Sequence, residues 1–297
     1  MASSLDFGHR RRLDLALADP EPQLGLEQAT DAKLPTTPVR RHRFEPVPFD
    51  RPLPLLSAAP AARLSIGMVT FNAAAVLERA LQSILRHKTP AMELVIVDGA
   101  SGDGTLDILR RHARDIDHWR SEPDKGIYDA MNKVRRLATG DWLLFLGADD
   151  ELLLPAETLL QQFKRQDVLY YGDVRLRNSG RISGGCFSRY RLMQQNICHQ
   201  AICYPKSIYR TKAYATDSGL LADHRYNIEL VGSGVPFVHV DEVVACFDDT
   251  GRSSVGDPTF EHVKLQLIRE NFGLPLYLVK RARNLAVRLL KTHHVAA

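Results

Sequence analysis

The fold is decided by the stretch Ala138-Thr-Gly-Asp-Trp-Leu-Leu-Phe-Leu-Gly-Ala-Asp-Asp150. Its middle, Trp142 to Leu146, is a run of apolar residues without interruption, as expected for a strand buried on both faces of a sheet. The run ends abruptly at Gly147, and two acids follow after one alanine. The sequence therefore predicts a central strand over residues 142–146 with an acidic pair at its carboxyl end.

Short apolar strands alternate with amphipathic helices around this central strand. Strands are expected over residues 64–70, 93–98 and 118–121, and helices over 74–87, from the Gly-rich turn 99–104 to about 112, and over 127–138. Such alternation is typical of an α/β fold with a mostly parallel sheet covered by helices on both faces. Ligands of open α/β sheets bind outside the carboxyl ends of the strands. Asp98 and Asp149 both fall at such ends, so we expect them to converge on one crevice.

The rest of the chain divides around this core. Residues 63–154 form the expected nucleotide-binding half, and residues 155–272, with strands near 168–177 and 235–247, form the expected acceptor-binding half. Residues 1–62 are rich in proline and are predicted to be a flexible arm, with an extended strap against the main domain as the alternative. Residues 273–297 are predicted to form a basic amphipathic helix.

Composition limits the partners and the compartment. The 297 residues are 44% hydrophobic, and a net charge of +4 is far below that of a nucleic-acid binder. The four cysteines lie at irregular spacings, which favours reduced thiols in the cytoplasm over disulfides or zinc. No apolar signal-peptide core follows the arginines at positions 10–12, and no run of about eighteen apolar residues predicts a spanning helix.

Four motifs in order carry a resemblance to a known family. They are Ser65-Ile-Gly-Met-Val-Thr-Phe-Asn72, Val97-Asp-Gly-Ala-Ser-Gly-Asp-Gly-Thr105, Glu122-Pro-Asp-Lys-Gly-Ile-Tyr-Asp-Ala-Met-Asn132 and the central stretch that ends at Asp150. Together they resemble glycosyltransferase family 2, over about residues 64–247. The resemblance implies a GT-A fold and an inverting transfer of a sugar from a nucleotide diphosphate to a hydroxyl acceptor. UDP is the default nucleotide, with GDP and dTDP open.

The resemblance also implies roles for single residues. The expected nucleotide-sugar contacts are Thr70 and Asn72 at the lip of the site, Asp98 on the base or ribose, Asp124 and Lys125 on a second loop, and Asp149 and His199 near the sugar diphosphate. A cation such as Lys125 suits a position near phosphate. His199 is equally compatible with a satisfied structural histidine.

A metal and a base complete the implied chemistry. Asp149 and Asp150 match the family's ligands for Mg²⁺ or Mn²⁺, ions that prefer oxygen ligands. In the family, one acid ligates the metal and another contacts the ribose or a metal-bound water. Many relatives carry a further acid where this chain has Gly147, so it stays open which of these roles belongs to Asp149 and which to Asp150. Without the other three motifs, the pair would be interpreted as a turn and a cap of the following helix.

Asp223 matches the family's general base, which removes the acceptor proton as the new bond forms. Ala222 replaces the usual preceding acid, and His224 and Arg225 replace a more common Tyr-Asp. The alternative role of Asp223 is an N-cap of the following helix. The Gln-x-x-Arg-Trp signature of processive synthases is missing, which favours addition of a single sugar.

Three alternatives remain open at this stage. The basic tail either packs on the domain or lies on an anionic membrane, where a lipid-linked saccharide acceptor would be found. The chain could be an inactive GT-A-like scaffold that binds a partner enzyme. A dinucleotide-binding oxidoreductase is disfavoured, because the turn after the first strand, Thr70-Phe-Asn-Ala-Ala-Ala, lacks the required glycines.

Overall fold

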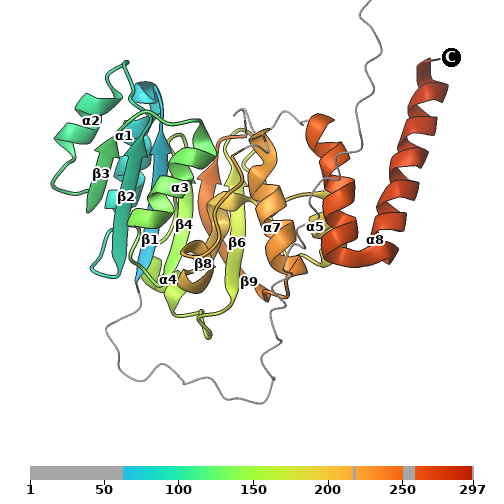
Figure 1. Cartoon of the computed structure of the whole chain (residues 1–297). Helices are drawn as coiled ribbons and strands as arrows, with labels where there is room; N and C mark the ends of the chain where they lie inside the picture. Colours follow the sequence, from blue (N-terminus) through green and yellow to red (C-terminus); the bar gives the residue numbers. More distant parts are fainter. Residues whose placement is uncertain (1–62, 217–218, 250–257, 296–297) are drawn as a thin grey trace, which may run out of the picture. The chain divides into compact units, whose positions relative to one another are not determined.

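The structure is a computed structural model that describes residues 63–216, 219–249 and 258–295. The chain divides into two units, Met1–Glu45 and Pro46–Ala297, and every described residue belongs to the second. The predicted arm, residues 1–62, therefore lies outside the described residues. Figure 1 shows a central sheet with helices on its faces.

The first half of the sheet is a parallel block. Its strands are β1 (Leu64–Thr70), β2 (Met92–Asp98), β3 (His118–Ser121) and β4 (Trp142–Gly147), in the order β3-β2-β1-β4. Every pair in this block is parallel. Strands β1 and β2 are buried from Leu64 and Met92 onward, as expected for strands with helices on both faces. The expected strands of this half are confirmed.

The second half of the sheet is mixed. It continues β4-β8-β6-β9-β5, with β5 (Glu151–Leu152), β6 (Leu169–Leu176), β8 (Ile202–Pro205) and β9 (Phe237–Phe247), while β7 (Ile182–Ser183) pairs with β6. Strand β8 runs antiparallel to both β4 and β6. Strands β6 and β9 are again parallel, so their carboxyl ends lie at the same edge as that of β4. The sequence pattern predicted β6 and β9 but not the short strands β5, β7 and β8.

Helices cover both faces of the sheet. One face carries α1 (Ala74–Leu85), α2 (Thr105–Arg111) and α4 (Ala156–Leu160), whose apolar residues join one core cluster. The other carries α3 (Ile127–Leu137), α5 (Arg189–Gln194), α6 (Lys206–Tyr209), α7 (Ala222–Gly232) and the first part of α8 (Pro258–Val295). Two 3-10 turns, η1 (His199–Ala201) and η2 (Gly219–Leu221), connect these elements. The layered α/β architecture is the predicted one.

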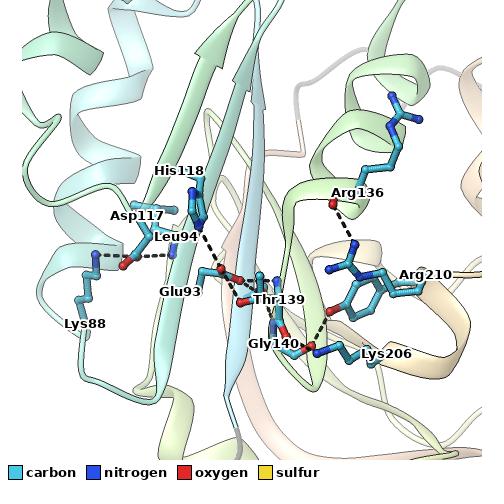
Figure 2. Close-up of polar contacts among 12 residues, drawn as sticks. Lys88, Glu93, Leu94, Asp117, His118, Arg136, Thr139, Gly140, Lys206 and Arg210 are labelled. Carbon is cyan, nitrogen blue, oxygen red and sulfur yellow. Dashed lines mark hydrogen bonds and ion pairs between the residues drawn. The ribbon is translucent and has the colours of Figure 1, made fainter.

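A polar cluster closes the amino edge of the parallel block, away from the carboxyl ends. Figure 2 shows the buried carboxylate of Glu93 between His118 and Thr139. It accepts hydrogen bonds from the Thr139 backbone N–H and hydroxyl, both at 2.8 Å, and from Ser65. Burial alone would raise the pKa of Glu93, but these bonds outweigh it and lower the pKa below its ordinary value. This cluster ties β1, β2 and the start of β4 together.

The C-terminal helix α8 is interrupted at Gly273. That glycine has a φ of 84°, a left-handed conformation in which the helix cannot continue, and Pro275 follows it. Beyond the break, the Arg283 guanidinium donates to the Gln194 side chain at the end of α5. The tail thus contains the predicted helix and contacts the domain. Within the described ranges, no helix combines the length and apolar character needed to cross a membrane.

Candidate active site

The carboxyl ends of β1, β2 and β4 bring predicted residues to one edge of the sheet. In the register of the parallel block, Thr70 lies beside Asp98 and Val69 lies beside Gly147. The loops after β1, β2 and β4 therefore start side by side, as the sequence predicted. The edge is extended by the ends of β6 and β9, where Arg177 and Asp248 follow the strands.

Asp98 organises the loop after β2. The residue is 0% exposed, and its carboxylate accepts from the Thr70 hydroxyl at 2.9 Å and from the Ser121 hydroxyl at 2.6 Å. It also accepts from the backbone N–H and hydroxyl of Ser101, at 2.9 and 2.5 Å. Burial would raise the pKa of Asp98, but the hydrogen bonds lower it, so the group is ionised. Both oxygens already have partners, and its contact with the nucleotide stays a prediction.

Asn72 links the loops after β1 and β2. Its backbone N–H donates to the Ser101 hydroxyl at 2.8 Å, and its side-chain oxygen accepts from the Gly102 N–H at 3.0 Å. The residue has a φ of 48°, a left-handed conformation that asparagine tolerates better than most residues. Thr70 and Asn72 are thus brought to the same rim, where the exposed Asn72 remains accessible.

Asp124 lies against the turn after β2, and its contact with the nucleotide stays a prediction. A Cβ at Gly99 would stand 2.5 Å from an Asp124 carboxylate oxygen, so the glycine makes room for this acid. The Phe71 ring borders the same glycine and is 65% exposed. An exposed aromatic ring beside two polar loops is suited to stack on a base. Sequence reasoning missed Phe71, although its place directly after Thr70 was a usable signal.

Lys125 lies next to Asp124 with an exposed side chain. Its backbone N–H donates to Asp129 at 3.1 Å, at the start of α3. The structure therefore places Lys125 on the predicted loop, and its contact with phosphate stays a prediction.

Asp150 forms the buried core of the acidic turn. It is 1% exposed and accepts from the Gly147 N–H and the Asp248 N–H, both at 3.0 Å. Burial, reinforced by the nearby Asp149 charge, raises the pKa of Asp150 to about 6 despite these bonds. A Cβ at Gly147 would stand 2.5 Å from Asp150 and 2.7 Å from Asp149 carboxylate oxygens. Any side chain at position 147 would therefore require both carboxylates to move.

Two arginines that the sequence did not single out converge on Asp149. Arg79 and Arg177 each donate to its backbone carbonyl, at 3.2 and 3.0 Å. Both also pair with Glu151, at 3.1 and 2.7 Å. These contacts hold the backbone of Asp149, and its carboxylate is partly exposed. The arginines come from α1 and from the end of β6, positions that no local pattern connects to the acidic pair.

The turn η1 connects the acidic pair with the predicted base. The Gln200 side chain hydrogen-bonds to the Asp150 carboxylate, and the Cys198 thiol donates to Gln200 at 3.0 Å. His199 lies between Cys198 and Gln200 in the sequence, and its Nδ1 is 3.9 Å from an Asp223 carboxylate oxygen. Burial lowers the pKa of His199 and Asp223 only partly offsets this, so the imidazole is neutral at pH 7. His199 thus lies beside Asp223, and its contact with the sugar diphosphate stays a prediction.

Asp223 lies in the first turn of α7 and faces the same edge. Tyr128 donates to its Oδ1 at 3.1 Å, and Asn196 donates to its Oδ2 at 2.7 Å. The N-cap of α7 is Leu221, so Asp223 does not occupy the capping position that was its alternative role. A carboxylate held by two side chains beside a neutral histidine can accept a proton from a substrate hydroxyl.

The residues at this edge fit a divalent metal ion in part. No group of three His, Cys, Asp or Glu side chains suited to an ion is present among the described residues. Asp149 offers a partly exposed carboxylate next to the buried Asp150. Mg²⁺ is commonly held by one or two carboxylates together with water and substrate phosphates. Such an ion therefore suits this acidic turn, with Asp149 as the accessible ligand.

Comparisons with known proteins agree with this geometry. Residues 65–212 match the Glycosyl transferase family 2 profile. A PGL/p-HBAD biosynthesis glycosyltransferase of Mycobacterium tuberculosis is 38% identical over 233 residues, which cover 74% of this chain and 90% of that protein.

Solved structures support the fold. The S. aureus TarS 1-349 complex with UDP superposes with a TM-score of 0.56 at 15% identity, covering 69% of this chain and 64% of that one. The chain thus spans less than two thirds of that protein. The mannosyltransferase PcManGT from Pyrobaculum calidifontis, in complex with GDP-Man and Mn²⁺, superposes with a TM-score of 0.53 at 19% identity, covering 83% and 84%. From its sequence match and its fold, this chain is a member of glycosyltransferase family 2 with a GT-A fold.

Proposed function

We propose that this enzyme transfers one sugar from a nucleotide diphosphate sugar to a hydroxyl acceptor with inversion, and that Asp223 is the general base. The observation that carries the proposal is the arrangement of Asp149, His199 and Asp223 along one edge of the sheet. The acceptor would be a saccharide or a lipid-linked saccharide, since a relative at 38% identity acts in PGL/p-HBAD biosynthesis.

The chemistry follows from the positions of these groups. Asp223 accepts the proton of the acceptor hydroxyl while the acceptor oxygen bonds to the anomeric carbon of the donor sugar. The bond between that carbon and the phosphate oxygen breaks on the opposite face, and the nucleotide diphosphate leaves with the electron pair. The loops of Asn72, Asp98 and Asp124 hold the nucleotide, with Phe71 against the base. These residues position the donor so that its anomeric carbon faces Asp223.

Mg²⁺ or Mn²⁺ held by Asp149 and Asp150 would neutralise charge on the departing diphosphate. Asp149 presents the accessible oxygens, and Asp150 fixes the turn. Since burial raises the pKa of Asp150 to about 6, this carboxylate loses its negative charge as the pH falls through that value. Donor binding that depends on Mn²⁺ should therefore weaken as the pH falls below 6.

A thermal-shift panel tests this function. UDP-, GDP- and dTDP-sugars are each added with and without Mn²⁺ at pH 7.5 and at pH 5.5. We expect one nucleotide class to raise the melting temperature by several degrees, because binding at 100 times Kd stabilises by about 2.7 kcal/mol. The increase should require Mn²⁺ and shrink at pH 5.5. If none of these nucleotides changed the melting temperature, the inactive-scaffold alternative would be favoured.

We further propose that the enzyme acts at the cytoplasmic face of an anionic membrane through the second part of α8. Leu274, Leu278 and Leu285 are exposed there. At 100° per residue they fall within about 40° of one another, on one side of the helix. Arg281 borders this side, while Arg283 contacts Gln194 of the domain. An exposed leucine stripe with flanking arginines suits insertion at an anionic lipid surface.

Co-sedimentation with vesicles tests the membrane contact. The full chain should sediment with phosphatidylcholine vesicles that contain phosphatidylglycerol, and less with phosphatidylcholine alone. Replacing Leu278 and Leu285 with glutamate should reduce binding by about tenfold or more, since apolar burial is lost and acids are repelled. Val238→Glu, an exposed position on β9, is the matched control. Equal binding of all three proteins would contradict the proposal.

A further inference from the structure

A chain of side-chain hydrogen bonds, buried at its Tyr204 end, leads to Asp223. Tyr204 donates from its hydroxyl to Asn227 Oδ1 at 2.9 Å, and Asn227 Nδ2 donates to Asn196 Oδ1 at 2.9 Å. Asn196 Nδ2 then donates to Asp223 Oδ2 at 2.7 Å. From the other side, the Tyr128 hydroxyl donates to Asp223 Oδ1 at 3.1 Å. Both carboxylate oxygens therefore have a donor.

The order of donors and acceptors in this chain is fixed. Asn196 uses its oxygen toward Asn227 and its NH₂ toward Asp223, and a flipped amide would place two NH₂ groups or two oxygens against each other. The Tyr204 hydroxyl can donate or accept, so the direction of the chain is set at its Asp223 end, where a carboxylate oxygen accepts. In the observed order the Asn196 amide donates to Asp223, and Asn227 and Tyr204 follow from that orientation.

The four partners come from separate parts of the fold. Tyr128 lies on α3 in the nucleotide-binding half, and its ring packs against Tyr214 with centroids 5.6 Å apart. Asn196 lies between α5 and η1, and Asn227 lies one turn after Asp223 on α7. Tyr128 and Asn227 are buried, so water cannot easily replace a donor that is removed. The carboxylate is thus held between the two halves of the domain.

Other titratable groups also face Asp223. His199 of η1 places its Nδ1 3.9 Å away, and Cys198 of the same segment interacts with Asp223 electrostatically. Tyr204 and Tyr214 also interact with Asp223 electrostatically. Burial is the main cause that raises the pKa of Tyr204, Tyr214 and Cys198. These groups are uncharged at pH 7, as is His199. Within the part of the chain that the structure describes, Tyr128 and Asn196 are thus the donors seen on the Asp223 oxygens.

We infer that Tyr128 and Asn196 are positioning residues that hold Asp223 in one orientation, and that Asn227 and Tyr204 orient Asn196. The inference rests on the proposed role of Asp223 as the base. It assigns a function to Tyr128, whose hydroxyl reaches Asp223 across 95 positions of sequence. Each oxygen of Asp223 keeps a further lone pair, which is available to the acceptor hydroxyl.

Steady-state kinetics of the full chain test the inference in Tyr128→Phe and Asn196→Ala. Tyr128→Phe keeps the ring that packs on Tyr214, so it removes one donor with little change in packing. We expect kcat to fall about tenfold, because the carboxylate loses a donor that fixes its orientation. The KM for the donor sugar should change less than twofold, which separates a positioning effect from a general loss of structure.

Tyr209→Phe is the matched control. Its hydroxyl donates to the Gly140 carbonyl at the amino edge of the sheet, so its kcat should match that of the wild type. A kcat within twofold of the wild type in both Tyr128→Phe and Asn196→Ala would overturn the inference, and so would an equal loss in Tyr209→Phe. If the wild type transferred no sugar, the proposed function would fail separately. The ¹³C chemical shift of the Asp223 carboxyl at pH 7.5, compared between wild type and Tyr128→Phe, would then decide the inference, and an unchanged shift would overturn it.

Discussion

Replacing Asp223 with asparagine should reduce sugar transfer by about 10²- to 10⁴-fold, the usual contribution of a general base. The asparagine keeps the size of the side chain and can still accept from Asn196 while donating to the Tyr128 hydroxyl. The fold and the donor site should therefore be retained. Without the carboxylate, the acceptor hydroxyl has no group to take its proton as the new bond forms.

Release of nucleotide diphosphate, measured with saturating donor and acceptor, checks this prediction. Donor affinity, measured by calorimetry, should change less than twofold, which separates loss of chemistry from loss of binding. Asp241→Asn, at an exposed acid on β9, is the control and should keep wild-type turnover. Turnover of Asp223→Asn within a factor of ten of the wild type would exclude Asp223 as the base.

Much of the fold could be predicted because the buried strands carry their own signal. Trp142 to Leu146 is fully buried in the structure, and its apolar run is visible without any knowledge of its neighbours. The turn after such a strand must reach the sheet edge, so the locations of Asp98 and Asp149 followed from the order of strands alone. Strand β8 was missed because its residues, Ile202–Pro205, are too few to show a periodicity.

The connections within the site could not be predicted, since they depend on contacts between distant residues. Arg177 is 28 positions from the Asp149 carbonyl that it contacts, and Tyr128 is 95 positions from Asp223. Nothing in the local sequence of either residue indicates its partner. Which of the two acids does which job likewise stayed open from the sequence, because burial of Asp150 under Asp248 needs the ends of β4 and β9 to meet.

Replacing Asp149 with asparagine should reduce metal-dependent transfer by about 10²- to 10⁴-fold, because a bound metal contributes several kcal/mol to stabilising the leaving group. The melting temperature should stay near that of the wild type. The Asp149 carboxylate is partly exposed, and the backbone carbonyl that Arg79 and Arg177 hold is unchanged by this substitution.

Asp150→Asn is the matched comparison and should behave differently. Asp150 accepts backbone N–H groups of Gly147 and Asp248 on its two oxygens, and asparagine would turn an NH₂ toward one of these donors. A buried donor left without a partner costs about 1–3 kcal/mol, so the melting temperature should fall by several degrees. Scanning fluorimetry and a Mn²⁺ titration of nucleotide diphosphate release on both variants distinguish the two roles. Full Mn²⁺-dependent activity in Asp149→Asn, or an Asp150→Asn protein as stable as the wild type, would contradict this division. The expected split, with metal binding lost in one variant and stability in the other, follows from a structural difference between the acids: Asp149 is partly exposed, while Asp150 is buried and holds the turn.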